Sequence, residues 1–115
     1  MSDYKVDIIN HLPHIHPEYV GSLPESMEII DVRSEEEYHS ELGHIKGSKL
    51  ITKGPELEEY LKQCGPDKEI LFVCRSGKRS GDMTHYCHNE LGMKNTYNMT
   101  GGMLLWNQLE FPILR

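Results

Sequence analysis

One of the three cysteines stands at the head of a short basic loop. The segment from Cys74 to Ser80 reads Cys-Arg-Ser-Gly-Lys-Arg-Ser and carries three cations, Arg75, Lys78 and Arg79. The thiolate is the nucleophilic form of cysteine, and nearby cations lower the pH at which a thiol ionises from about 8.5 to as little as ~3.5. A lone cysteine is most often a buried structural residue, but a loop this basic does not suit that role. We predict that Cys74 is a nucleophile acting on an anionic substrate.

The residues on either side of the loop predict a strand before it and a helix after it. The apolar run Ile70–Val73 is typical of a strand buried on both faces of a parallel sheet. Beyond the loop, apolar residues recur at helical spacing as far as Leu91, and Gly92 suits a left-handed C-cap. Amide N–H groups at the start of a helix are unpaired and carry partial positive charge. Cys74 is therefore expected where a thiolate is stabilised, between a strand's carboxyl end and a helix N-terminus.

The other readable segments predict an α/β fold around that site. Further strands are expected at residues 28–32, 49–51 and 96–99. Helices are expected after the capping-box pair Ser34 and Glu37, from Pro55, and after the Gly101-Gly102 pair. Alternating strands and helices indicate a parallel sheet covered on both faces, and such sheets bind ligands beyond the carboxyl ends of their strands. We expect a central, mostly parallel sheet of about five strands, with helices on both faces.

Residues 1–23 are the least readable part of the chain. Tyr4, Val6 and Ile8 alternate as in a strand, but the apolar residues that follow have no clean period. His11, His14 and His16 lie close together in the sequence, yet the prolines among them disfavour a regular helical face on which metal ligands could converge. We expect these histidines to lie in a solvated loop and do not expect a metal site.

Several other polar or sulfur-containing residues are given structural roles. Asp31 and Arg33 are expected to hold loops through hydrogen bonds and a salt bridge, and His44 is assigned a similar role. Cys64 and Cys87 fall on the apolar faces of predicted helices and are interpreted as core residues, although participation of Cys87 beside Cys74 stays open. Trp106 is likewise expected in the core.

The composition restricts the class of protein. The chain has 115 residues, 37% of them hydrophobic and 26% charged, with a formal charge of −6. We expect one globular domain over residues 1–115, without nucleic-acid binding or membrane insertion, existing as a monomer or weak dimer. No apolar stretch of secretory-signal type follows the charged start, and three cysteines do not indicate a disulfide framework. A cytoplasmic location is the expectation.

The order and spacing of the motifs resemble the rhodanese-like domain family. The match covers roughly residues 28–111. Besides the loop at Cys74, it consists of Asp31-Val32-Arg33 with Glu37-Tyr38, Gly43-His44-Ile45-Lys46-Gly47-Ser48, and Tyr97-Asn98 with Gly101-Gly102 and Trp106. Ser48 stands where the family usually has alanine. The resemblance implies a rhodanese-like three-layer domain.

That resemblance also implies a thiosulfate sulfurtransferase-like activity. In this chemistry the thiolate of Cys74, the catalytic residue, takes a sulfur from an anionic donor such as thiosulfate, holds it as a persulfide and passes it to cyanide, a thiol or a protein cysteine. Neither a metal nor an organic cofactor is required. Backbone N–H groups of the loop are expected to cradle the persulfide, and the implied substrate-binding residues are Arg75, Ser76, Gly77, Lys78, Arg79 and Ser80.

Two alternative functions are weighed against this interpretation. Cysteine phosphatases need five residues between cysteine and arginine, whereas Cys74 and Arg79 enclose four and position 80 is serine, so a phosphatase or an oxyanion reductase is less favoured. A non-catalytic or sulfur-relay interaction module is the other alternative. The intact Cys74 argues against a non-catalytic module, because inactive family members usually lack this residue.

Overall fold

A six-stranded sheet forms the centre of the molecule, in a computed structural model that describes residues 3–115. The strand order is β1-β2-β6-β5-β3-β4. In chain order the strands are β1 (Val6–Ile9), β2 (Leu12–Ile15), β3 (Glu28–Asp31), β4 (Lys49–Leu50), β5 (Ile70–Val73) and β6 (Thr96–Met99). All neighbours pair in parallel except β1, which pairs antiparallel with β2. The expected mostly parallel sheet is confirmed, with β1 as an additional antiparallel edge strand.

Helices cover both faces of this sheet. The chain has the helices η1 (Pro17–Ser22), α1 (Glu35–Tyr38), α2 (Pro55–Gln63), α3 (Lys78–Glu90) and α4 (Gly102–Gln108). One core cluster joins α2 and α3 to residues such as Ile30 and Phe72, whereas the other joins α4 to Leu71 and Val73. Alternate residues of β5 thus face opposite layers, because side chains of a strand alternate between its two faces. The three-layer α/β fold is therefore as expected.

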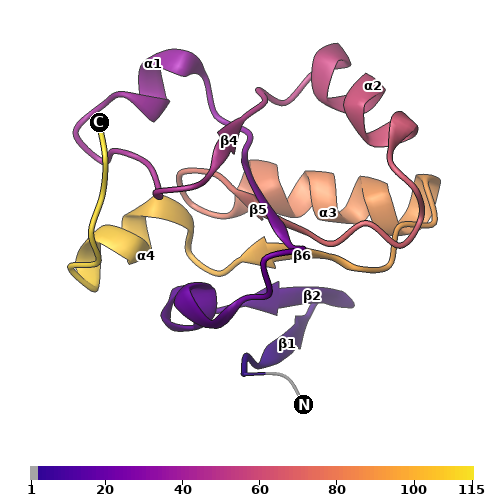
Figure 1. Cartoon of the computed structure of the whole chain (residues 1–115), viewed down its shortest axis with the longest axis horizontal. Coiled ribbons are helices and arrows are strands. Elements are labelled where there is room, and N and C mark those ends of the chain that lie inside the picture. Colours follow the sequence, from indigo (N-terminus) through magenta and orange to yellow (C-terminus); the bar gives the residue numbers. More distant parts are fainter. Residues whose placement is uncertain (1–2) are drawn as a thin grey trace.

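The middle of the sheet is where the burial is most complete. All four residues of β5 are inaccessible to solvent, since β6 and β3 flank the strand and helices cover both its faces. Figure 1 shows the N-terminal hairpin β1–β2 and the short strand β4 on opposite sides of this centre. The carboxyl end of β5 thus leads into a loop anchored by the best-buried strand of the molecule.

Most local signals in the sequence produce the elements they predict. Ser34 and Glu37 form the reciprocal capping box of α1, Pro55 begins α2, and Gly92 adopts a φ of 65° just after α3. The predicted strands at residues 28–32 and 49–51 are slightly shorter in the structure, at Glu28–Asp31 and Lys49–Leu50. Among the described residues, no helix combines the length and apolarity needed to cross a bilayer.

The N-terminal segment differs from its prediction. Met1 and Ser2 lie outside the described residues, but the next residues build a hairpin in which Ile9 pairs with Leu12. Asn10 and His11 form its two-residue turn, and both have positive φ, at 52° and 66°, as a primed hairpin turn requires. The solvated loop expected for the histidines is wrong for His14, which lies half-buried in β2.

Candidate active site

Cys74 lies where the sequence predicted it, directly after β5 and before α3. Its residue is only 1% exposed, and two hydrogen-bond donors lie against its sulfur. The backbone N–H of Gly77 donates to Sγ over 3.1 Å, and the hydroxyl of Ser80 lies 3.2 Å from Sγ. Gly77 is the N-cap of α3, and Ser80 lies in the first turn of that helix. Gly77 has a φ of 97°, a conformation that favours glycine, and this turn directs its N–H toward the sulfur.

The start of α4 fixes the orientation of the loop's first peptide units. The backbone N–H groups of Met103 and Leu104 donate to the carbonyl oxygens of Cys74 and Arg75, over 2.9 and 3.0 Å. In a trans peptide the N–H points away from the C=O, so the following N–H groups point away from α4. This approach requires Gly102, because a Cβ at that position would collide with both carbonyl oxygens. By binding these carbonyl oxygens, helix α4 leaves the N–H donors of the loop, and not its carbonyl acceptors, pointing toward the interior of the loop.

The loop contains a concentration of free backbone donors. Within residues 3–115, no acceptor is positioned to receive a hydrogen bond from five of its amide N–H groups, those of Arg75, Ser76, Lys78, Arg79 and Ser80. Unpaired amides at a helix N-terminus attract anions. Together with the N–H of Gly77 on Sγ, these donors give the loop the chemistry of an anion-binding site.

Asn98 on β6 joins the two groups that contact the sulfur. Its Oδ1 accepts a short hydrogen bond from the hydroxyl of Ser80, and its Nδ2 donates to the carbonyl oxygen of Gly77 over 3.0 Å. Nδ2 also lies 3.2 Å from Nδ1 of His14. Sequence reasoning placed Asn98 in a strand and in a family motif but gave it no role in the site. The only signal in the sequence was a polar side chain at the end of a buried strand.

The three cations of the loop have different surroundings. Arg79 binds Glu37 of α1 with two hydrogen bonds, from Nη1 over 2.7 Å and from Nη2 over 2.8 Å. The Arg79 guanidinium is the main reason that the pKa of Glu37 falls from 4.5 to about 2. Arg75 and Lys78 are exposed, and neither forms an ion pair with any residue of the described part of the chain. Positive charge facing solvent is thus carried mainly by Arg75 and Lys78.

A buried ion pair supports the neighbouring loop. Arg33 and Asp31 are each about 1% exposed and are joined by several hydrogen bonds, including one of 2.8 Å from Nη2. The same Nη2 donates to the carbonyl oxygen of Gly43 over 2.7 Å. His44 stacks on Tyr38 and places Nδ1 2.8 Å from the Tyr38 carbonyl oxygen. Asp31, Arg33 and His44 therefore hold loops, as predicted from the sequence.

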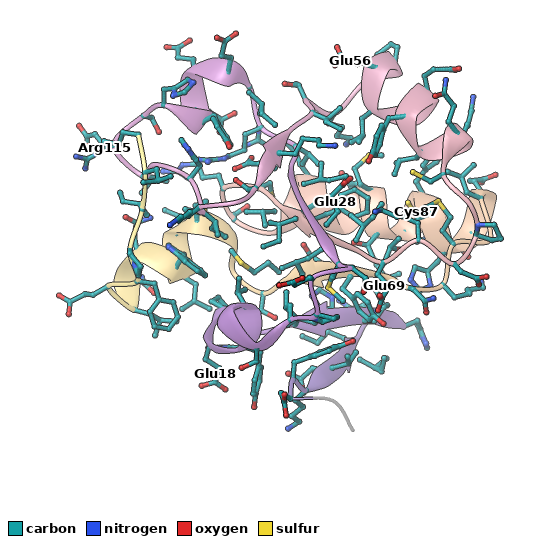
Figure 2. The ribbon with its side chains drawn as sticks, viewed as in Figure 1. Glu18, Glu28, Glu56, Glu69, Cys87 and Arg115 are labelled. Carbon is teal, nitrogen blue, oxygen red and sulfur yellow. The ribbon has the colours of Figure 1, made fainter. Side chains whose placement is uncertain are left out.

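The other two cysteines lack the features of Cys74. Cys87 is fully buried in the core on α3, and burial raises its pKa to about 12, so it stays a neutral thiol. Figure 2 labels this residue on α3. Cys64 is half-buried, its Sγ is 3.4 Å from the Tyr60 carbonyl oxygen, and burial raises its pKa as well. All three cysteines are free, and the core positions predicted for Cys64 and Cys87 match the structure, with Cys64 at the edge.

A cavity of about 320 Å³ lies elsewhere in the molecule. It is bounded by η1, β3, α4 and the C-terminal segment, with Ile29, Trp106 and Ile113 among its lining residues. No residue of the Cys74–Ser80 loop contributes to it. The lining of this cavity is mostly apolar and contains no cysteine, so the cavity does not compete with Cys74 as the candidate site.

Comparisons with known proteins agree with this geometry. The sequence model of the rhodanese-like domain matches residues 16–109. YtwF of Bacillus subtilis, provisionally named a sulfurtransferase, is 39% identical over 82 residues, covering 71% of this chain and 75% of that protein. Thiosulfate sulfurtransferase 18 of Arabidopsis thaliana is 32% identical over 100 residues, covering 73% of this chain and 69% of that protein.

Solved structures give the same result. The crystal structure of a rhodanese-related protein from Thermoplasma volcanium is similar with a TM-score of 0.66 at 27% identity, covering 84% of this chain and 88% of that one. The family model spans most of the chain, and sulfur transfer is the general activity that its relatives support. The chain therefore belongs to the rhodanese-like domain family.

Proposed function

We propose that this protein moves a sulfane sulfur from an anionic donor such as thiosulfate, through a persulfide on Cys74, to a thiol, a protein cysteine or cyanide. The observation that carries the proposal is the sulfur of Cys74, which accepts hydrogen bonds from Gly77 and Ser80 at the start of α3. A site built from N–H and O–H donors stabilises a negatively charged sulfur. The same donors suit both the thiolate and the anionic persulfide.

The reaction takes two displacement steps. The Cys74 thiolate attacks the outer sulfur of thiosulfate, the new S–S bond to Sγ forms, and sulfite leaves with the electron pair of the bond that breaks. The persulfide then carries the negative charge on its terminal sulfur. An acceptor thiolate or cyanide attacks this terminal sulfur, and Cys74 departs as a thiolate. Each step exchanges one anion for another, so the positive potential of the loop serves the whole cycle.

The residues of the loop divide between holding the sulfur and recruiting the donor. We assign the free backbone N–H groups from Arg75 to Ser80, with that of Gly77, to the persulfide cradle. Arg75 and Lys78 attract the doubly charged donor, because they are exposed and unpaired within residues 3–115. Arg79 is held by Glu37 through two of its N–H groups, which leaves its remaining donors for the anion.

The length of the loop favours sulfur transfer over phosphoryl transfer. Cys74 and Arg79 enclose four residues, one fewer than the phosphatase pattern requires. Arg79 also donates two hydrogen bonds to Glu37 of α1, so only part of its guanidinium is left to enclose a tetrahedral phosphate. The smaller terminal sulfur of a persulfide needs no such enclosure.

Intact-protein mass spectrometry tests the proposal. After treatment with thiosulfate and removal of excess reagent, the wild-type protein should gain the mass of one sulfur atom, and dithiothreitol should remove it. Cys74→Ser should gain nothing, whereas Cys64→Ser and Cys87→Ser should gain one sulfur. Thermal melts of all variants show whether each is folded. A folded wild-type protein that acquires no sulfur would support the interaction-module alternative instead.

A further inference from the structure

The pairing of β2 with β6 brings an N-terminal histidine to the catalytic loop. In the parallel register, His14 lies opposite Asn98, and Asn98 in turn pairs with Phe72 of β5, two residues before Cys74. Asn98 is 3% exposed and Ser80 is fully buried. The three polar side chains of His14, Asn98 and Ser80 therefore form one continuous hydrogen-bonded chain that ends at the sulfur of Cys74.

The chemistry of each partner fixes the direction of these hydrogen bonds. The carbonyl oxygen of Gly77 can only accept, so the group of Asn98 that faces it must be the amide Nδ2. Oδ1 then faces Ser80 and accepts its proton. Because Nδ2 also faces Nδ1 of His14, that ring nitrogen must be an acceptor. The ring proton of His14 therefore resides on Nε2.

We propose that Asn98 is a positioning residue for the nucleophile, and that neutral His14 in its Nε2–H form holds Asn98 in the required orientation. The proposal rests on Cys74 being the nucleophile, as proposed above. Asn98 binds the carbonyl oxygen of Gly77 and the hydroxyl of Ser80, the two residues whose donors contact Sγ. Rotation of the Asn98 amide by half a turn would set Oδ1 against two acceptors, the Gly77 carbonyl oxygen and Nδ1 of His14, so both groups favour the productive orientation.

Ser80 has one hydroxyl proton and two acceptors for it, Oδ1 of Asn98 and Sγ of Cys74. When Cys74 is a thiol, its S–H donates to Ser80 and the Ser80 proton goes to Asn98. When Cys74 is a thiolate or a persulfide anion, the Ser80 proton turns to the sulfur. Asn98 holds the Ser80 oxygen beside Sγ in the thiol state and, through Nδ2, holds the Gly77 peptide unit in both states, which is the positioning role.

Protonation of His14 would break this arrangement, because an Nδ1–H cannot accept from Asn98. Burial lowers the pKa of His14, while a hydrogen bond with the Ile9 backbone and the charge of Asp7 act in the opposite direction. Asp7 lies across from His14 on β1 and is paired with Lys5. Helix α3 also packs against β2, and two of its charged residues, Arg79 and Asp82, are ion-paired with Glu37 and Lys53. The lowered pKa favours neutral His14 at pH 7.

Nitrogen NMR of the histidine rings in the wild-type protein tests the tautomer directly. At pH 7.5, His14 should show an unprotonated Nδ1 and a protonated Nε2, with a scalar coupling or a proton exchange pattern that places the hydrogen on Nε2. A His14 ring protonated on Nδ1 at this pH overturns the proposal. The measurement involves no sulfur transfer, so its failure leaves the proposed persulfide chemistry intact.

The second arm measures how fast a small neutral reagent alkylates Cys74 as a function of pH. His14→Leu leaves one Nδ2–H of Asn98 without an acceptor. Because hydrogen bonding to the thiolate then weakens, the pH at which the alkylation rate is half-maximal should rise by about one unit. His14→Gln supplies an oxygen acceptor and should restore the wild-type profile. His11→Gln is the matched control, since His11 is exposed in the turn of the hairpin. Identical profiles for His14→Leu and the wild type overturn the proposal.

Discussion

The ion pair between Arg79 and Glu37 allows a quantitative prediction, which the substitution Glu37→Gln tests. Glutamine keeps one oxygen acceptor for the Ser34 backbone N–H, as a capping box requires, and removes the negative charge together with one of the two oxygens that accept from Arg79. The pKa of Glu37 falls from 4.5 to about 2, which corresponds to an upper limit of about 3 kcal/mol. The side chains are 37% and 31% exposed, and solvent screening reduces this to about 1 kcal/mol. We expect Glu37→Gln to destabilise the protein by that amount at pH 7.

The sign of the pH dependence follows from the direction of the shift. Glu37 has a lower pKa in the folded state than in the unfolded state, so its contribution is complete above its unfolded pKa of ~4.5 and is lost as pH falls toward 2. The difference in unfolding free energy between wild type and Glu37→Gln should therefore be constant from pH 7 to pH 6. It should then shrink to less than half by about pH 3.

Urea unfolding followed by circular dichroism measures this difference at each pH. Asp82→Asn is the matched control, because Asp82 forms a single 3.0 Å contact with Lys53 and both side chains are more exposed. That control should cost at most about 0.5 kcal/mol at pH 7. A Glu37→Gln variant as stable as wild type at pH 7, or a difference that does not change between pH 7 and pH 3, would refute the assigned role of the ion pair.

Three further substitutions give separate outcomes. Lys78→Ala should raise the KM for thiosulfate severalfold without shifting the pH profile of Cys74 alkylation, if this exposed cation recruits the donor; an upward-shifted profile would contradict that role. Cys87→Ser should retain sulfur transfer but lower stability by about 1–3 kcal/mol, because the site is buried and apolar; chemical denaturation and a turnover assay check both parts. Gly102→Ala should cost about 3 kcal/mol, because its Cβ collides with the carbonyl oxygens of Cys74 and Arg75 at a φ of 59°; an unchanged melting temperature would contradict the described packing.

The parts of the fold that depend on local signals could be predicted from the sequence. The buried strand β5 is an unbroken apolar run in the sequence, and the start of α1 is marked by a capping-box pair. The end of α3 is marked by Gly92, which adopts a positive φ in the structure. Because the loop at Cys74 lies between two such elements, its place at the carboxyl edge of the sheet followed without further information. Each of these elements is determined by residues that are close to one another in the sequence.

The parts that depend on contacts between distant residues could not be predicted. The hairpin turn at Asn10 and His11 lacks the glycine that usually marks a primed turn, so β1 and β2 gave no clear signal. The role of Asn98 depends on sheet register, which places it beside His14 across 84 positions of sequence. Arg79 was counted as one of three equivalent cations because nothing local indicates its partner Glu37, 42 residues away.

The near-complete burial of Cys74 sets a limit on which reagents can reach it. With the residue 1% exposed, we expect small reagents to reach the bare sulfur faster than bulky thiol reagents do. A persulfide changes this situation, because its terminal sulfur lies about 2 Å beyond Sγ, the length of one S–S bond. The transferable sulfur of the loaded protein therefore lies farther from the Cys74 backbone than the bare thiolate does. We expect this extension to help a wide acceptor, such as a cysteine on a protein surface, to reach the transferable sulfur.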